Sequence, residues 1–230
     1  MTDDVPTGCA ALDSLLGGGF ERGTATQLYG PPGAGKTNLA LSASVAVASE
    51  GGQALYIDTE GLSIDRFEQV LSGTGGDESV AQHIVVTEAT DFAEQAESVR
   101  DAAEFAPQMD LIVLDSATGF YRLERTGDTE RGDALRTVAD QVTQLLALAR
   151  KHDLAVVLTN QVFSDPERES GRPRPLGGHT LSHWTGTILR LDRYKGGNRK
   201  ATVEKHRAKP EGETVQFQIT EDGIDGSGER

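Results

Sequence analysis

Residues 30–37 read GPPGAGKT and lie between an apolar run at Thr24–Tyr29 and a helix-like segment at Asn38–Ala48. The spacing fits G-x-x-x-x-G-K-[ST], and a strand before it with a helix after it is the context that this motif requires. Glycines let backbone N–H groups turn towards phosphate oxygens, and the helix N-terminus adds positive potential. The stretch predicts a phosphate-binding loop made of Gly30, Pro31, Pro32, Gly33, Ala34, Gly35, Lys36 and Thr37.

Within this loop, two side chains have separate predicted roles. Lys36 is expected to contact the terminal phosphates, and Thr37 to coordinate Mg²⁺. A second apolar run ends in Asp115, which supplies the expected acid for the water shell of the same metal ion. An acid at the end of a strand can instead cap the next turn, and that alternative stays open for Asp115 taken alone.

Two further strand ends carry polar side chains suited to phosphate chemistry. Glu60 follows the run Gln53–Asp58 and is positioned to orient or deprotonate a water molecule. The alternative is a helix N-cap, to which Asp58 is also suited. Gln161 follows another apolar run, and its amide can hydrogen-bond a terminal phosphate and report its presence. Glu60 and Gln161 are therefore the candidate catalytic residues.

Up to Asn160, strand-like and helix-like segments alternate. The predicted strands are Thr24–Tyr29, Gln53–Asp58, His83–Thr87, Leu111–Asp115 and Leu154–Asn160, and the predicted helices are Asn38–Ala48, Ile64–Leu71, Asp91–Phe105 and Gly132–His152. This alternation predicts an α/β fold with a mostly parallel central sheet and helices on both faces. Acids at strand ends would then lie at the carboxyl edge of the sheet, where ligands bind.

After Leu181 the pattern changes. Segments 185–194, 200–207 and 213–220 read as antiparallel strands joined by short polar turns, with Gly196 and Gly197 in a hairpin turn. We expect these strands to extend the same sheet. The prediction is a single domain over residues 1–223, followed by a flexible tail at residues 224–230.

Two irregular segments contain arginines. Segment 163–179 is rich in Pro, Gly and Arg without periodicity, and segments of this kind are usually functional or disordered. In segment 119–132 aromatic and guanidinium groups are combined that can stack on bases, although Phe120 and Tyr121 can equally belong to the core. For segment 163–179 nucleic-acid contact is favoured over plain disorder, whereas for segment 119–132 both interpretations stay open. The candidate nucleic-acid-binding residues are Arg122, Arg125, Arg168, Arg172 and Arg174.

The chain is strongly acidic, with 36 Asp and Glu against 22 Lys and Arg and a formal net charge of −14. Such a surface often serves solubility. Here the acids are spread along the whole length and lysine is scarce, which favours a halophilic protein that works in molar salt. At ~1 M salt the Debye length falls to ~3 Å, so the net charge does not exclude nucleic acid as a partner.

Compartment is indicated by what the sequence lacks. A single cysteine, Cys9, cannot form an intramolecular disulfide. Apolar runs fall short of the ~18 residues of a membrane span, and the N-terminus does not have the pattern of a signal peptide. The sequence predicts a soluble cytoplasmic protein with no membrane partner.

Several motifs, in order and at matching distances, resemble the core of the RecA superfamily. YIDTEG (56–61), LIVLDSATGFYR (111–122), VVLTNQV (156–162) and PLGGHTLSHWTGTILRL (175–191) are similar to the branch of archaeal RadA and eukaryotic recombinases. The similarity runs from about Pro6 to Gly223. Neither a helix-hairpin-helix domain nor a Phe-x-x-Ala segment precedes Thr7, so the chain resembles a short archaeal recombinase paralogue.

The resemblance implies a RecA-like P-loop ATPase core with ATP and Mg²⁺ as cofactors. It implies that Glu60 is the hydrolytic glutamate and Gln161 the nucleotide-sensing amide, and Arg66 falls near the arginine that packs on adenine. Segments 122–132 and 163–175 match the two DNA-binding loops of the family. The implied partners are DNA, especially single-stranded DNA, the RadA recombinase and other recombination proteins, with an oligomer left open.

The implied function is ATP-modulated DNA binding in homologous recombination and DNA repair, as a mediator of RadA with weak ATP hydrolysis. Two alternatives stay open: a strand-exchange recombinase with DNA-dependent ATPase activity, and a regulatory ATPase of the same superfamily that acts on proteins. A metabolic P-loop kinase is disfavoured, because such enzymes need an arginine-bearing lid, and TNQV before a long loop has no place in them.

Overall fold

The computed structural model describes residues 4–122, 128–163, 174–195 and 197–226. The helices, with short 3₁₀ turns labelled η, are α1 (Ala10–Leu16), α2 (Lys36–Ser49), α3 (Ile64–Gly73), α4 (Glu78–Ala81), α5 (Phe92–Phe105), η1 (Ala106–Gln108), η2 (Phe120–Arg122), α6 (Asp128–His152) and α7 (Gly178–Trp184). The strands are β1 (Ala25–Gly30), β2 (Ala54–Asp58), β3 (Ile84–Glu88), β4 (Leu111–Asp115), β5 (Ala155–Phe163), β6 (Arg174–Pro175), β7 (Thr187–Arg193), β8 (Asn198–Lys205), β9 (Thr214–Thr220) and β10 (Gly223–Asp225).

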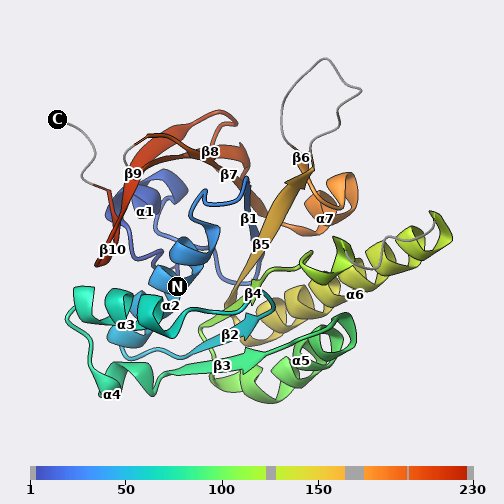
Figure 1. The fold of residues 1–230 in the computed structure, drawn as a ribbon, viewed down its shortest axis with the longest axis horizontal. Coiled ribbons are helices and arrows are strands. Elements are labelled where there is room, and N and C mark those ends of the chain that lie inside the picture. Colours follow the sequence, from blue (N-terminus) through green and yellow to red (C-terminus); the bar gives the residue numbers. More distant parts are fainter. Residues whose placement is uncertain (1–3, 123–127, 164–173, 196, 227–230) are drawn as a thin grey trace.

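The described strands form one sheet with the order β10-β9-β8-β7-β1-β5-β4-β2-β3, and β6 pairs with β5 beside this path (Figure 1). Neighbours from β7 to β3 run parallel. The pairs from β7 to β10 are antiparallel. The predicted fold class, a mostly parallel sheet with a C-terminal antiparallel extension, is confirmed.

Helices cover both faces of the sheet, as predicted (Figure 1). Successive residues of a strand point to opposite faces, and β4 follows this rule: Val113 packs in the cluster that includes Leu12 of α1 and Leu39 of α2. Its neighbour Ile112 packs in the cluster that includes Val99 of α5 and Val138 of α6, and all of these residues are buried. Burial on both faces explains why the strand LIVLD is apolar until its last residue.

The register of the central strands brings the predicted site residues to one edge. Gly30 at the end of β1 is paired with Gln161 of β5. Asp58 at the end of β2 is paired with Asp115 at the end of β4. The carboxyl ends of these four strands therefore meet, which is the place where an open parallel sheet binds ligands.

The structure differs from the sequence prediction in three places: the direction of one strand, the start of one helix and the end of the sheet. The sequence predicts β7 to be antiparallel like the strands after it, but it runs parallel to β1. A parallel neighbour needs a crossover connection, and the chain crosses back through α7 before β7 begins. α6 begins at Asp128, so residues 128–132 of the predicted loop are helical; the acids of the sequence DTER favour a helix start.

At the C-terminus, Ile224 and Asp225 belong to β10, which pairs with β9. The sheet therefore extends two residues into the predicted tail, because the turn before Gly223 returns the chain along β9. Within the described residues no helix has the length and apolar character needed to cross a membrane.

We expect Gly30→Ala to lower the free energy of unfolding by about 1–3 kcal/mol, the usual effect of overpacking. A Cβ on Gly30 would lie 2.2 Å from the backbone oxygen of Leu191 in β7. The oxygen belongs to the backbone of β7, which cannot move aside as the end of a flexible side chain could. The measurement is chemical denaturation at fixed salt.

Gly132→Ala is the matched control, because a Cβ on Gly132 in α6 meets no described heavy atom within 4 Å. This substitution should leave stability unchanged or raise it by up to about 1 kcal/mol. Equal stabilities of the two variants would show that β1 and β7 can separate at Gly30 without cost.

Candidate functional site

The predicted phosphate-binding loop connects β1 to α2. Gly33 and Gly35 have φ angles of 72° and 100°, a left-handed conformation that glycine adopts without a steric penalty. Lys36 opens α2 and is 9% exposed. Its Nζ donates hydrogen bonds to the backbone oxygens of Gly30 at 3.0 Å and Pro31 at 3.3 Å. The lysine thus lies folded against the loop from which it would contact a phosphate.

The ammonium group of Lys36 is electrostatically unusual. Burial lowers its pKa below the ordinary value, while the negative charges of Glu60 and Asp115 act in the opposite direction and are the smaller effect. Desolvation disfavours the charged form of an amine, whereas nearby carboxylates favour it. A lysine in this environment gains from a bound anion, which supplies a further negative charge.

Asp115 is 2% exposed and accepts hydrogen bonds from two hydroxyl groups. Tyr56 Oη donates at 2.6 Å, and the hydroxyl of Thr159 also donates to the carboxylate. The hydroxyl of Thr37 is a third group whose interaction lowers the pKa of Asp115. Burial raises the pKa of Asp115, and the three hydroxyl groups lower it by a smaller amount. The predicted metal-associated acid therefore lies in contact with the predicted metal ligand Thr37.

Thr37 and Asp115 fit a Mg²⁺ site of the kind that depends on nucleotide. Mg²⁺ usually takes one or two protein oxygens and completes its octahedron with phosphates and water. One hydroxyl and one carboxylate match that donor set. A cluster of three or more His, Cys, Asp or Glu able to hold a metal ion by itself is absent from the described part of the chain.

Glu60 lies in the turn after β2. The carboxylate of Asp58 accepts hydrogen bonds from the backbone N–H groups of Glu60 and Gly61, both at 3.1 Å, so Asp58 fixes the turn rather than the chemistry. Glu60 Oε1 accepts hydrogen bonds from Ser116 Oγ at 2.9 Å and from Gln161 Nε2 at 2.8 Å. The two predicted catalytic residues are thus in direct contact across β4.

Gln161 and its neighbour Asn160 connect this edge to both predicted loops. The Gln161 carbonyl accepts from the backbone N–H of Leu176 at 2.9 Å, just beyond the second segment. Asn160 Nδ2 donates to the Leu176 carbonyl at 2.7 Å. Asn160 Oδ1 accepts from the hydroxyl of Thr118 at 2.7 Å, shortly before the first segment. The side-chain amide of Asn160, together with the backbone of Gln161, therefore anchors one end of each segment.

Arg66, the predicted adenine-packing residue, extends from α3 towards the turn between β9 and β10. Its guanidinium donates to Asn38 Oδ1 at 2.6 Å and to the backbone oxygens of Glu221 at 2.8 Å and Gly223 at 3.3 Å. Arg66 therefore links α2, α3 and the last turn of the sheet. Contact with a base stays a prediction.

Of the predicted DNA-binding residues, Arg125, Arg168 and Arg172 lie outside the described residues. The backbones of Arg122 and Arg174 lie in η2 and β6. Tyr121 is 8% exposed and belongs to the core cluster of α5 and α6. The alternative that Tyr121 is a core residue is therefore confirmed.

Sequence reasoning missed three hydroxyl residues of the site. Ser116 lies one residue after Asp115, and Thr159 lies two residues before Gln161. Tyr56 lies on β2 opposite Val113 in register. The sequence does indicate that these hydroxyls matter, because a hydroxyl at a buried strand end needs a hydrogen-bond partner. Which acceptor each hydroxyl meets depends on the strand order.

The comparisons with known proteins agree with this geometry. The Rad51 family model matches residues 3–227. The chain belongs to the Rad51 family. It is 66% identical over 222 residues to the DNA repair and recombination protein RadB of Halobacterium salinarum, covering 96% of this chain and 94% of that protein. Identity to the protein of the same name from Methanococcoides burtonii is 41%, covering 97% and 98%.

A solved structure of the RadB recombinase is also similar, with a TM-score of 0.82 and 37% identity, covering 96% of this chain and 98% of the other. The resemblance to RecA-like recombinases is thereby confirmed as Rad51-family membership. The relative from Halobacterium salinarum also agrees with the halophilic interpretation of the acidic composition.

We expect the affinity for ATP to begin to fall at a lower pH than it would if Lys36 had the pKa of an ordinary lysine. Only protonated Lys36 offers a positive charge, and burial lowers its pKa below 10.5. Above that lowered pKa the affinity should fall by about tenfold per pH unit. The measurement is equilibrium binding of ATP between pH 7 and pH 10.5. The Lys36→Gln variant should bind ATP weakly, and its affinity should not change with pH. A wild-type affinity that stays constant to pH 10.5 would contradict this role of Lys36.

Proposed function

We propose that this chain is an ATP-binding and DNA-binding recombinase paralogue that acts in homologous recombination and DNA repair as a mediator of the RadA recombinase. The observation that carries the proposal is the hydrogen bond between Gln161 Nε2 and Glu60 Oε1 at 2.8 Å. It joins the edge that would hold the terminal phosphate to the strand from which the second predicted DNA-binding segment emerges. Family membership supports the same assignment.

Nucleotide binding follows from the phosphate loop. Backbone N–H groups at Gly33 and Gly35 and the N-terminus of α2 would face the phosphates. Lys36 would exchange its hydrogen bonds with the Gly30 and Pro31 carbonyls for contacts to the terminal phosphate. Mg²⁺, held by Thr37 and through water by Asp115, would neutralise part of the phosphate charge.

The contacts of Glu60 support slow hydrolysis. A general base must reach the water that it activates. One oxygen of Glu60 already accepts hydrogen bonds from Ser116 and Gln161. A nucleotide that draws the Gln161 amide away would change both the freedom of Glu60 and the position of β5. Weak turnover together with nucleotide-dependent DNA binding is the combination expected of a mediator.

DNA contact is proposed for the two arginine-containing segments. Thr118, Asn160 and Leu176 form a hydrogen-bonded connection between the residues that flank these segments. A shift of β5 would therefore reach both of them. Because phosphate contacts weaken steeply as salt rises, stacking on bases would carry a larger share of the binding in a salty cytoplasm.

The test is ATP turnover and single-stranded DNA binding in about 2 M KCl, comparing the wild type with Lys36→Ala. Lys36→Ala removes hydrogen bonds from a charged donor, worth about 1.5–3 kcal/mol, so the affinity for ATP should fall by about 10–150-fold. Lys151→Ala, at the exposed end of α6, is the matched control and should change neither quantity.

Nucleotide-sensitive DNA binding with little turnover is the expected result. Fast turnover that DNA stimulates and that needs Lys36 would replace the mediator assignment by a strand-exchange recombinase. If the wild type binds no DNA with or without ATP, the proposal fails.

A further inference from the structure

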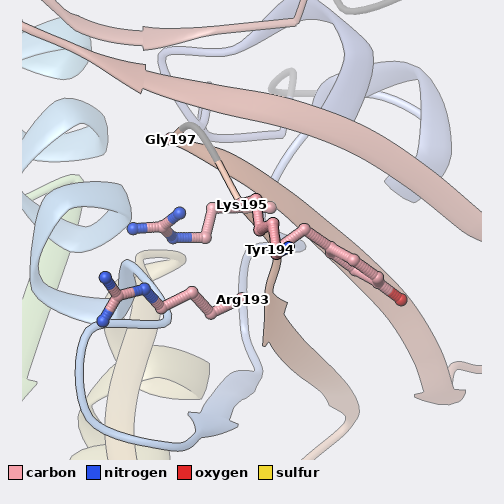
Figure 2. Close-up of a pocket in the computed structure, with 5 residues that line it drawn as sticks. Arg193, Tyr194, Lys195 and Gly197 are labelled. Atoms are coloured by element: carbon pink, nitrogen blue, oxygen red, sulfur yellow. The ribbon is translucent and has the colours of Figure 1, made fainter.

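A group of basic side chains next to the phosphate loop has no role in the function proposed above. The hairpin between β7 and β8 carries Arg193, Lys195 and Arg199, which together with Tyr194 and Gly197 line an open pocket. Figure 2 shows Arg193 extending from the hairpin to one side, while the ring of Tyr194 extends to the other. The charged group of Arg193 and the ring of Tyr194 therefore lie on different sides of the hairpin.

Both arginines lie against the glycines of the loop. A Cβ added to Gly33 would lie 3.2 Å from Arg193 Nη1, so the absence of a side chain at Gly33 leaves room for the guanidinium of Arg193. A Cβ added to Gly35 would meet Ile219 Cδ1 at 2.8 Å, and Arg199 Cγ would lie 3.9 Å away. The positive charge of Arg193 is consequently adjacent to the backbone that would hold a phosphate.

Within the described ranges, Arg193 and Arg199 form no ion pair with a carboxylate. Arg190 on the same strand pairs with Asp192 at 3.1 Å and with Glu204 at 3.0 Å, so acids are available nearby. Arg199 is 9% exposed and its Nε has no hydrogen-bond partner, while its Nη1 donates to the Asn198 carbonyl at 2.9 Å.

This arrangement is unfavourable without a ligand. Burial lowers the pKa of Arg199, and the positive charge of Arg193 lowers it further. A buried guanidinium with an unpaired donor and a like charge beside it is expected to be destabilising. An anion placed between the two groups would satisfy the free donor and reverse the repulsion.

We propose that Arg193, Lys195 and Arg199 form a second phosphate-binding site, beside the phosphate loop and separate from it. Planar guanidinium groups bind phosphate oxygens in pairs, and a lysine adds a point charge. The ligand is a phosphate group, either from a nucleotide whose polyphosphate extends beyond the loop or from a DNA backbone that passes over the hairpin. Both sources present the same chemistry to the two arginines.

The double variant Arg193→Gln/Arg199→Gln tests the site. Arg136→Gln is the control, because Arg136 is exposed and pairs weakly with Asp133 at 3.6 Å. The probes are ATP, inorganic tripolyphosphate and a single-stranded oligothymidylate added to the ATP-saturated protein. The double variant should bind at least one probe about 10-fold more weakly, while the control should match the wild type.

Which probes bind the double variant more weakly identifies the source of the phosphate. Weaker binding of ATP and tripolyphosphate assigns the site to the nucleotide. Weaker binding of the oligonucleotide alone, with a salt dependence whose slope falls by about one per lost contact, assigns it to DNA. Unchanged affinity of the double variant for all three probes overturns the proposal of a second phosphate site. The proposed function still stands in that case if Lys36→Ala lowers the affinity for ATP.

Arg193→Gln/Lys195→Gln provides a second test that does not depend on a buried residue. Both side chains are exposed, so the variant should fold like the wild type. This variant should bind the same probe about 5-fold more weakly than the wild type, or weaker still. If this variant and the control bind all probes equally, the hairpin is not a phosphate site.

Discussion

The buried carboxylate of Asp115 is the constraint on which the arrangement of the site depends. A charged group removed from water must be satisfied by hydrogen bonds or paired with charge. The hydroxyls of Tyr56 in β2 and Thr159 in β5 donate to the carboxylate, and the hydroxyl of Thr37 in α2 further lowers its pKa. These contacts fix the two strands that flank β4 and the start of α2. The strand order places the phosphate loop, the turn that holds Glu60 and the end of β5 around one carboxylate.

From this centre, three further hydrogen bonds connect the site to the residues beside the arginine-containing segments. Glu60 accepts from Gln161, and the neighbouring Asn160 joins Thr118 to Leu176. Asn160 and Gln161 are adjacent on β5. A change in the contacts of Gln161 that moves this strand end would therefore reach residues that flank both arginine-containing segments.

Much of the site was predictable because motif spacing and strand position are local properties of the sequence. The loop at Gly30–Thr37 and the contact between Thr37 and Asp115 follow from a motif and a strand that ends in an acid. The pairing of β7 with β1 was not predictable, because register and direction depend on the path of the crossover. The basic hairpin was also missed, since Arg193 and Arg199 approach the loop only once β7 lies beside β1.

The most direct measurement of the central claim is the effect of a non-hydrolysable ATP analogue on single-stranded DNA affinity, in the wild type and in Gln161→Ala at the same salt. The account predicts a nucleotide effect of about 5–150-fold in the wild type, the usual range of coupling between two sites. It predicts almost none in Gln161→Ala, although that variant should still bind the analogue. A nucleotide effect of equal size in both proteins would contradict a connection through Gln161.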